Sequence, residues 1–192
     1  MKNPGQMVYI VDDDVSVRRA LKLLLEQLGF RVEAFPCAAD FLGFKHPKVS
    51  SCLVSDIRMP GISGLALQEA MAAQQLTIPI VFITGHGDIP MSVKAVQAGA
   101  IDFLPKPFTE KKLLNAIQRA IAKSKIQNKQ QAGISTIKRR IKTLSPRELE
   151  VFRLVARGML NKQIASKRGT SLQTIKVHRG RVMQKMQAKT VT

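Results

Sequence analysis

Five polar residues from four separate parts of the chain lie at or just after the ends of apolar segments: Asp12, Asp13, Asp56, Thr84 and Lys106. Three carboxylates brought together repel one another, and a hard divalent cation with a preference for oxygen ligands relieves that repulsion. Because the set contains no Cys or His, Mg²⁺ is expected rather than zinc. A carboxylate beside Mg²⁺ can attack phosphorus and form an acyl phosphate, while an ammonium and a hydroxyl bind the phosphoryl oxygens. The residue types therefore predict phosphoryl transfer.

The segments around these residues predict the elements that position them. Short apolar runs predict strands at residues 7–11, 31–35, 52–55, 79–83 and 100–104. Helical spacing of apolar residues predicts helices at about 15–28, 38–44, 64–75, 89–98 and 108–123. This alternation indicates an α/β fold, a doubly wound, flavodoxin-like five-stranded parallel sheet. Ligand sites in such sheets lie beyond the carboxyl ends of the strands, so the five polar residues are expected to meet there.

Each of these residues also has a structural interpretation. The run from Asp12 to Asp14 can cap the first helix, and we assign that role to Asp14 alone. Thr84 can be an ordinary loop residue, and Lys106 can belong to a solvated turn with Pro107. One shared site explains why all of these residues follow strands better than separate structural roles do.

These residues resemble, in order and spacing, the receiver domains of two-component response regulators. The resemblance extends from residue 7 to about 123 and is carried by four segments: Val11-Asp-Asp-Asp14, Asp56-Ile-Arg-Met-Pro-Gly61, Ile83-Thr-Gly-His-Gly-Asp88 and Phe103-Leu-Pro-Lys-Pro-Phe108. They are most similar to the FixJ/StyR-type subfamily.

The resemblance implies that Asp56 is the phosphoacceptor and that a sensor histidine kinase is the donor. It implies that Asp13, Asp56 and the backbone carbonyl of Arg58 bind Mg²⁺ directly, while Asp12 assists through water. Thr84 and Lys106 would contact the phosphoryl group and couple it to a switch.

The aromatic residue of that switch corresponds to Phe103, which can equally be a plain core residue. The surface that changes on activation lies within Ile89 to Lys123, on the fourth helix, fifth strand and fifth helix. In this family the changed surface forms a homodimer.

Charge divides the chain unevenly. Residues 1–123 hold 14 Lys and Arg and 11 acids, a net charge of +3; residues 124–192 hold 17 Lys and Arg against Glu148 and Glu150, a net charge of +15. Such an excess favours a polyanionic partner, and double-stranded DNA is the expected one. A generic solubility surface is the alternative explanation of the positive charge.

The sequence also predicts a cytoplasmic protein. No apolar run has the length of a membrane span or the pattern of a signal peptide. Cys37 and Cys52 are too few for a disulfide framework, so a reducing, cytoplasmic environment is expected.

The basic part divides into a linker and a small all-α domain. Residues 124–142 are Gln- and Lys-rich and predict a linker, helical in part, after a receiver at 1–123. Ser145 with Pro146 and Glu148 predicts a helix start with a capping box. Asn161 and Ser171 are expected to cap two further helices, the last running from Leu172 to about Gln187. Short helices joined by Gly-containing turns are typical of a helix-turn-helix, here at 143–192, although a generic helical bundle would give a similar local pattern.

This region resembles LuxR-type helix-turn-helix domains through Leu144-Ser-Pro-Arg-Glu-Leu-Glu150, Asn161-Lys-Gln-Ile-Ala165 and Thr174-Ile-Lys-Val-His-Arg179. The resemblance implies that the last helix enters the DNA major groove. Its base-edge contacts would be Lys176, Val177 and Arg179. Its phosphate contacts would be Lys162, Thr174, His178 and Arg181.

Two features depart from the LuxR pattern. Gly180 lies inside the last helix, where related domains carry a larger residue. The sequence reaches Thr192 before the fourth helix of such domains, so apolar surface around Val182 and Met186 is expected to be uncovered. We expect the C-terminal domain to be less thermally stable than the receiver.

The combined prediction is a transcription regulator that is phosphorylated at Asp56, binds Mg²⁺ and DNA, contacts RNA polymerase, and is not an enzyme beyond its own phosphorylation and dephosphorylation. An alternative is a phosphate sink or partner-titrating protein without productive DNA binding. A stand-alone phosphohydrolase would leave the basic helical region without a role.

Overall fold

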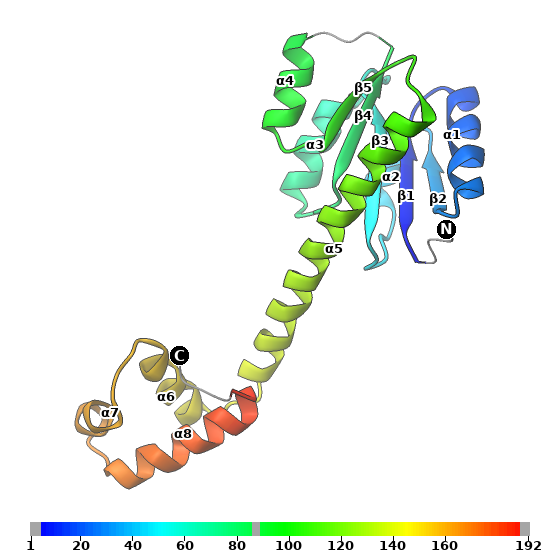
Figure 1. Ribbon diagram of the computed structural model, residues 1–192. Helices are drawn as coiled ribbons and strands as arrows, with labels where there is room; N and C mark the ends of the chain where they lie inside the picture. Colours follow the sequence, from blue (N-terminus) through cyan, green and yellow to red (C-terminus); the bar gives the residue numbers. More distant parts are fainter. Residues whose placement is uncertain (1–4, 86–88, 189–192) are drawn as a thin grey trace. The chain divides into compact units, whose positions relative to one another are not determined.

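The structure is a computed structural model that describes residues 5–85 and 89–188. It consists of two compact units, one ending at Lys129 and one beginning at Gln130 (Figure 1). His86, Gly87 and Asp88, which belong to one of the receiver-like segments, lie outside the described residues. None of the described helices combines the length and the apolar character that crossing a membrane requires.

The first unit is built on the predicted five-stranded parallel sheet. Its strands are β1 (Met7–Val11), β2 (Arg31–Phe35), β3 (Ser51–Asp56), β4 (Ile80–Thr84) and β5 (Asp102–Pro105). Their order is β2-β1-β3-β4-β5, so the chain runs to one side of β1 and then to the other. The register pairs Val11 with Ser55 and Asp56 with Ile83, which brings the carboxyl ends of β1, β3 and β4 to one edge.

Helices cover both faces of the sheet, as the alternating pattern predicts (Figure 1). They are α1 (Val15–Gln27), α2 (Ala38–Gly43), α3 (Gly64–Ala73), α4 (Ile89–Gln97) and α5 (Glu110–Ile141). Leu25 of α1 and Ile117 of α5 belong to the apolar core on one face. Phe41 of α2 and Leu67 of α3 belong to the core on the other face. Two buried cores therefore hold the strand ends in place.

Helix α5 is longer than its apolar pattern predicts. The expected helix ends near Lys123, but α5 continues to Ile141 through most of the segment expected to be a linker. Gln, Lys and Ala are good helix formers, and the one glycine in this stretch, Gly133, has open space around it. The start of the expected linker also packs on the first unit, because the Ser124 hydroxyl accepts a hydrogen bond from the Ser51 N–H at 3.0 Å.

The second unit contains the three predicted helices after the end of α5. They are α6 (Pro146–Ala156), α7 (Asn161–Arg168) and α8 (Leu172–Met186). The predicted capping box is present: the Ser145 hydroxyl accepts from the Glu148 N–H at 3.3 Å, and the Glu148 carboxylate accepts from the Ser145 N–H at 2.8 Å. Ser171 caps α8 by accepting from the Thr174 N–H at 3.0 Å.

Two expectations for this unit are wrong. Asn161 is the first residue of α7 rather than its cap, and the backbone N–H of the preceding Leu160 is satisfied by the side-chain oxygen of Gln163 at 2.8 Å. Val182 is not uncovered, since it is only 4% exposed. Extensive packing of α8 on α6 within the unit accounts for its burial.

Candidate functional site

Three carboxylates gather at the carboxyl edge of the sheet. Asp12 follows β1 and is fully buried, Asp13 is exposed, and Asp56 ends β3 with 8% of its surface exposed. One oxygen from each lies within 4.8 Å of the others. Oxygen donors at this spacing suit a hard divalent cation, so the structure brings the predicted ligand residues together.

A lysine links two of these carboxylates. The Lys106 Nζ donates to Asp56 Oδ2 at 2.9 Å and to Asp12 Oδ2 at 3.1 Å. Burial alone would lower the pKa of Lys106, but the hydrogen bonds and charges of Asp56 and Asp12 outweigh it and raise the pKa. Lys106 therefore remains an ammonium and offsets part of the repulsion between the carboxylates.

Burial dominates the electrostatics of Asp12. Its pKa is raised by desolvation, although the Asp14 N–H at 2.8 Å from Oδ1 and the Lys106 ammonium both act in the opposite direction. Asp14 itself caps α1, accepting from the N–H groups of Ser16 at 2.7 Å and Val17 at 3.2 Å, and these bonds lower its pKa. The prediction that Asp14 is a cap is confirmed.

The loop after β3 folds back over Asp56. The Arg58 N–H donates to Asp56 Oδ1 at 3.1 Å, so the two oxygens of this carboxylate have different donors. The same loop is closed by the Gly64 N–H, which donates to the Ile57 carbonyl at 2.9 Å. Asp56 is thereby fixed in direction at the start of the loop.

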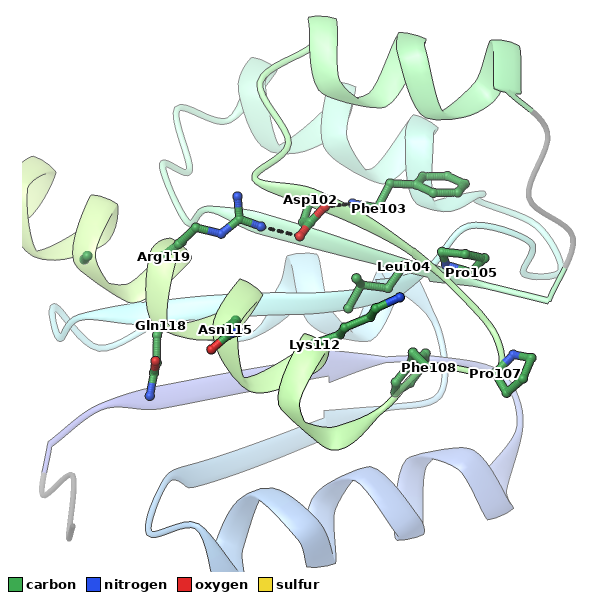
Figure 2. A pocket seen from close by; sticks show the side chains of 11 residues that line it. Asp102, Phe103, Leu104, Pro105, Pro107, Phe108, Lys112, Asn115, Gln118 and Arg119 are labelled. Carbon is green, nitrogen blue, oxygen red and sulfur yellow. Dashed lines mark hydrogen bonds and ion pairs between the residues drawn. The ribbon is translucent and has the colours of Figure 1, made fainter.

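The switch candidates lie on the last two strands. Thr84 is fully buried at the end of β4, and its carbonyl accepts from the Lys106 N–H at 2.7 Å. Phe103 is half-buried against the core on the α3 side of the sheet. Figure 2 shows its ring on the other side of β5 from Lys112 and Phe108. This position fits a core residue and a switch residue alike.

Helix α8 exposes a cationic surface in the second unit. Lys176, Arg181 and Val177, the last 44% exposed, face solvent, and no acid occurs in α7 or α8. Two of the predicted DNA contacts are half-buried: His178, and Arg179, whose Nη1 donates to Asn161 Oδ1 at 2.7 Å. The remaining predicted contacts, Lys162 and Thr174, are exposed.

Comparisons with known proteins agree with both units. Residues 8–118 match the response regulator receiver domain, and residues 142–192 match the bacterial regulatory proteins of the luxR family. The chain belongs to the two-component response regulators. Because residues 142–192 match a DNA-binding family as well, the comparisons argue against the alternative of a phosphate sink without DNA binding.

Curated relatives and solved structures cover nearly the whole response regulator. Nodulation protein W of Bradyrhizobium diazoefficiens is 45% identical over 96% of this chain and 82% of that protein. Response regulator protein TmoT of Ectopseudomonas mendocina is 44% identical over 100% of this chain and 87% of that protein. The structure of response regulator StyR has 46% identity and a TM-score of 0.83, covering 97% of this chain and 94% of that one. Full-length FixJ from B. japonicum has 40% identity and a TM-score of 0.58, covering 100% and 93%.

The response regulator has a hollow of about 850 Å³ between β5 and α5, the β5–α5 hollow. Its walls include Leu104, Phe108, Lys112 and Asn115 (Figure 2). At one end Arg119 reaches from α5 to form an ion pair with Asp102. The hollow lies on the surface expected to form the homodimer.

Two residues that shape the sites have contacts that the sequence did not predict. Gly64 packs so closely that a Cβ would lie 2.4 Å from the Asp56 carbonyl oxygen. Glu148, expected to be only a capping residue, also binds the Lys185 Nζ at 2.6 Å, and this hydrogen bond lowers its pKa to about 2. Neither contact has a local sequence signal, because each joins separate elements of the fold.

Proposed function

We propose that this response regulator accepts a phosphoryl group on Asp56 from a sensor histidine kinase and then regulates transcription by binding specific DNA sequences. The observation that carries the proposal is the setting of Asp56. It lies among three clustered carboxylates, and its two oxygens are held by the Lys106 ammonium and the Arg58 N–H.

The donor set fits Mg²⁺. Asp13, Asp56 and the backbone carbonyl of Arg58 would hold the ion, and the buried Asp12 would assist through water. When bound, Mg²⁺ neutralises negative charge on the carboxylates and on the phosphoryl oxygens.

The residues of the chain carry the transfer itself. A carboxylate oxygen of Asp56 attacks the phosphorus of the phosphohistidine donor, the P–N bond breaks, and the electron pair remains on the imidazole of the kinase. Lys106 offsets charge on the phosphoryl oxygens, and the Thr84 hydroxyl donates to one of them. The regulator catalyses only this step and the later loss of its own phosphate, so it is not an enzyme toward other substrates.

The phosphoryl group acts through a switch on the second half of the sheet. Thr84 is the first residue of this switch to respond. Phe103 is the second switch residue, unless its only role is packing in the core. The surface of α4, β5 and α5, which includes the β5–α5 hollow, then forms a homodimer. A phosphoryl group can bias this equilibrium only if it contacts the two states differently.

The proposed domains separate phosphorylation from DNA binding. A receiver at 1–123 and a helix-turn-helix domain at 143–192 are joined by residues 124–142. On α8, Lys176, Val177 and Arg179 read base edges, and the phosphate contacts come from Lys162, Thr174, His178 and Arg181. Its proposed partners, DNA and RNA polymerase, support a cytoplasmic location.

Phosphorylation is tested with acetyl phosphate and Mg²⁺, followed by mass spectrometry of the intact protein. The wild type is expected to gain the mass of one phosphoryl group and Asp56→Asn none. Asp40→Asn, the same change at an exposed position in α2, is the control and is expected to behave like the wild type. A phosphoryl group on the Asp56→Asn protein contradicts the assignment.

A further inference from the structure

A second, smaller hollow lies entirely within the helix-turn-helix unit, and charged and polar side chains line it together with Val151 and Ile175. This α6–α8 hollow has a volume of about 260 Å³. Arg147 and Glu150 contribute from α6, Arg168 from the end of α7, and Thr174 and His178 from α8. Arg147 and Arg168 are both exposed, so the hollow is a solvent-accessible surface site around which two arginines and a histidine gather.

One carboxylate serves both arginines. Glu150 Oε2 lies 2.5 Å from Arg168 Nη2 and 3.6 Å from Arg147 Nη1. Glu150 is one of only two acids after residue 123, and the other, Glu148, is already bound to Lys185. The two arginines therefore share a single negative charge, and the hollow keeps an excess positive charge.

His178 adds an unused hydrogen-bonding atom. Its Nδ1 is buried and has no hydrogen-bond partner among the described residues. A buried polar nitrogen without a partner costs free energy unless a bound group supplies one.

The position of the hollow on α8 indicates its ligand. Thr174 and His178 lie one helical turn apart, between the exposed residues Lys176 and Val177 and the buried Ile175. When a helix of this kind enters the major groove, the phosphate backbone passes along its flank. The hollow opens where that flank would be.

We infer that the α6–α8 hollow binds a phosphodiester of the DNA backbone, with Arg168 and Arg147 as its principal contacts. This rests on the proposed entry of α8 into the major groove. The planar guanidinium of Arg168 suits two phosphate oxygens, and His178 and Thr174 line the same space. In the free protein the Glu150 carboxylate pairs with Arg168 in place of the phosphate. This ion pair breaks when DNA binds.

The first test measures binding of a fluorescein-labelled, mixed-sequence DNA duplex to the full chain across a range of salt concentrations. Each phosphate contact contributes about 0.9 to the slope of log affinity against log salt, so Arg168→Gln is expected to lower the slope by about 0.9 and the affinity by about eightfold at ~0.1 M salt. Lys167→Gln removes the same charge one residue away, outside the hollow, and is the matched control. Equal effects of the two variants would overturn the inference.

The second test separates DNA binding from a structural role of the ion pair. Glu150→Gln frees both arginines, so it is expected to bind the duplex several-fold more tightly than the wild type. If the Glu150–Arg168 pair only supports the fold, Glu150→Gln instead binds more weakly and melts at a lower temperature, and the inference fails.

The third test identifies the source of the phosphate. The ring signals of His178, assigned in NMR spectra with a His178→Asn variant, are expected to shift on adding the duplex and to remain unchanged in inorganic phosphate at the same phosphate concentration. An equal shift with inorganic phosphate identifies a free-anion site and overturns the DNA assignment. A wild type that binds no duplex contradicts the proposed function as well, whereas normal wild-type binding with unaltered variants contradicts only this inference.

Discussion

Gly64 is expected to control both the stability of the receiver and the position of Asp56, the proposed phosphoacceptor. In Gly64→Ala the new Cβ would lie 2.4 Å from the Asp56 carbonyl oxygen, 2.9 Å from the Ile57 Cα and 3.0 Å from the Phe82 Cε1. Two of these three atoms belong to the backbone, so a rotamer change cannot remove the clash. Overpacking of this kind costs about 1–3 kcal/mol of unfolding free energy.

The clash is also expected to slow phosphorylation. Relief requires the start of α3 to move away from the end of β3, which carries the Asp56 carboxylate and the loop that donates the Arg58 N–H. A displacement of about 1 Å at a reacting group can lower a rate by about 100-fold. Gly64→Ala should therefore lose more activity than its loss of stability explains.

The assay uses the one tyrosine of the chain as a receiver-specific probe. Tyr9 is buried in β1, and there is no Trp, so intrinsic fluorescence during urea unfolding follows the receiver unit alone. Phosphorylation by acetyl phosphate is followed by mass spectrometry of the same samples, under conditions in which both proteins remain folded. Gly43→Ala, with no atom within 4 Å of the new Cβ, is the control. Equal stability and equal phosphorylation rates of Gly64→Ala and Gly43→Ala would contradict a role for Gly64 in positioning Asp56.

Three further outcomes follow from single contacts. Gly180→Ala places a Cβ in open space on α8, so it should stabilise the second unit by about 1 kcal/mol; calorimetry showing no gain would contradict this. The Glu148 carboxyl, whose pKa is lowered from 4.5 to about 2, contributes stability that is complete above pH 4.5 and lost as the pH falls toward 2; Glu148→Gln should show no such dependence in acid unfolding curves. Because burial raises the pKa of Asp12, its ionised form reduces the stability of the receiver at neutral pH. Asp12→Asn should therefore melt at a higher temperature than the wild type in EDTA, but its melting temperature should rise less on adding Mg²⁺. A lower melting temperature of Asp12→Asn in EDTA would show that ionised Asp12 is stabilising instead.

That the residues of the candidate phosphorylation site lie together could be predicted, because their position depends on the topology of the sheet. Once the strands ending before Asp12, at Asp56 and before Lys106 are recognised as parallel strands of one sheet, their carboxyl ends must lie at one edge. The side-chain geometry there could not be predicted in the same way. That Lys106 binds Asp12 and Asp56 together depends on distances that only the packed sheet sets.

The extent of α5 and the α6–α8 hollow were not predictable for different reasons. Apolar periodicity marks helices that bury a stripe, whereas the second half of α5 exposes Ile126, Ile134 and Ile137 and is helical through its residue propensities. The hollow joins Glu150 to Arg168 across two helices, so no local spacing indicates it. Such contacts arise from tertiary packing.

The charges at the sheet edge link the proposed phosphorylation of Asp56 to the proposed binding of Mg²⁺. Three carboxylates against the single Lys106 ammonium leave two negative charges in excess, which matches one divalent cation. Converting Asp56 to an acyl phosphate replaces one carboxylate charge by a phosphoryl group of about two, so the excess grows rather than disappears. Lys106 already binds both Asp12 and Asp56, and therefore cannot offset the added charge alone. If Asp56 is the phosphoacceptor, as proposed, its phosphorylated form would therefore depend on the divalent cation more than the free form does.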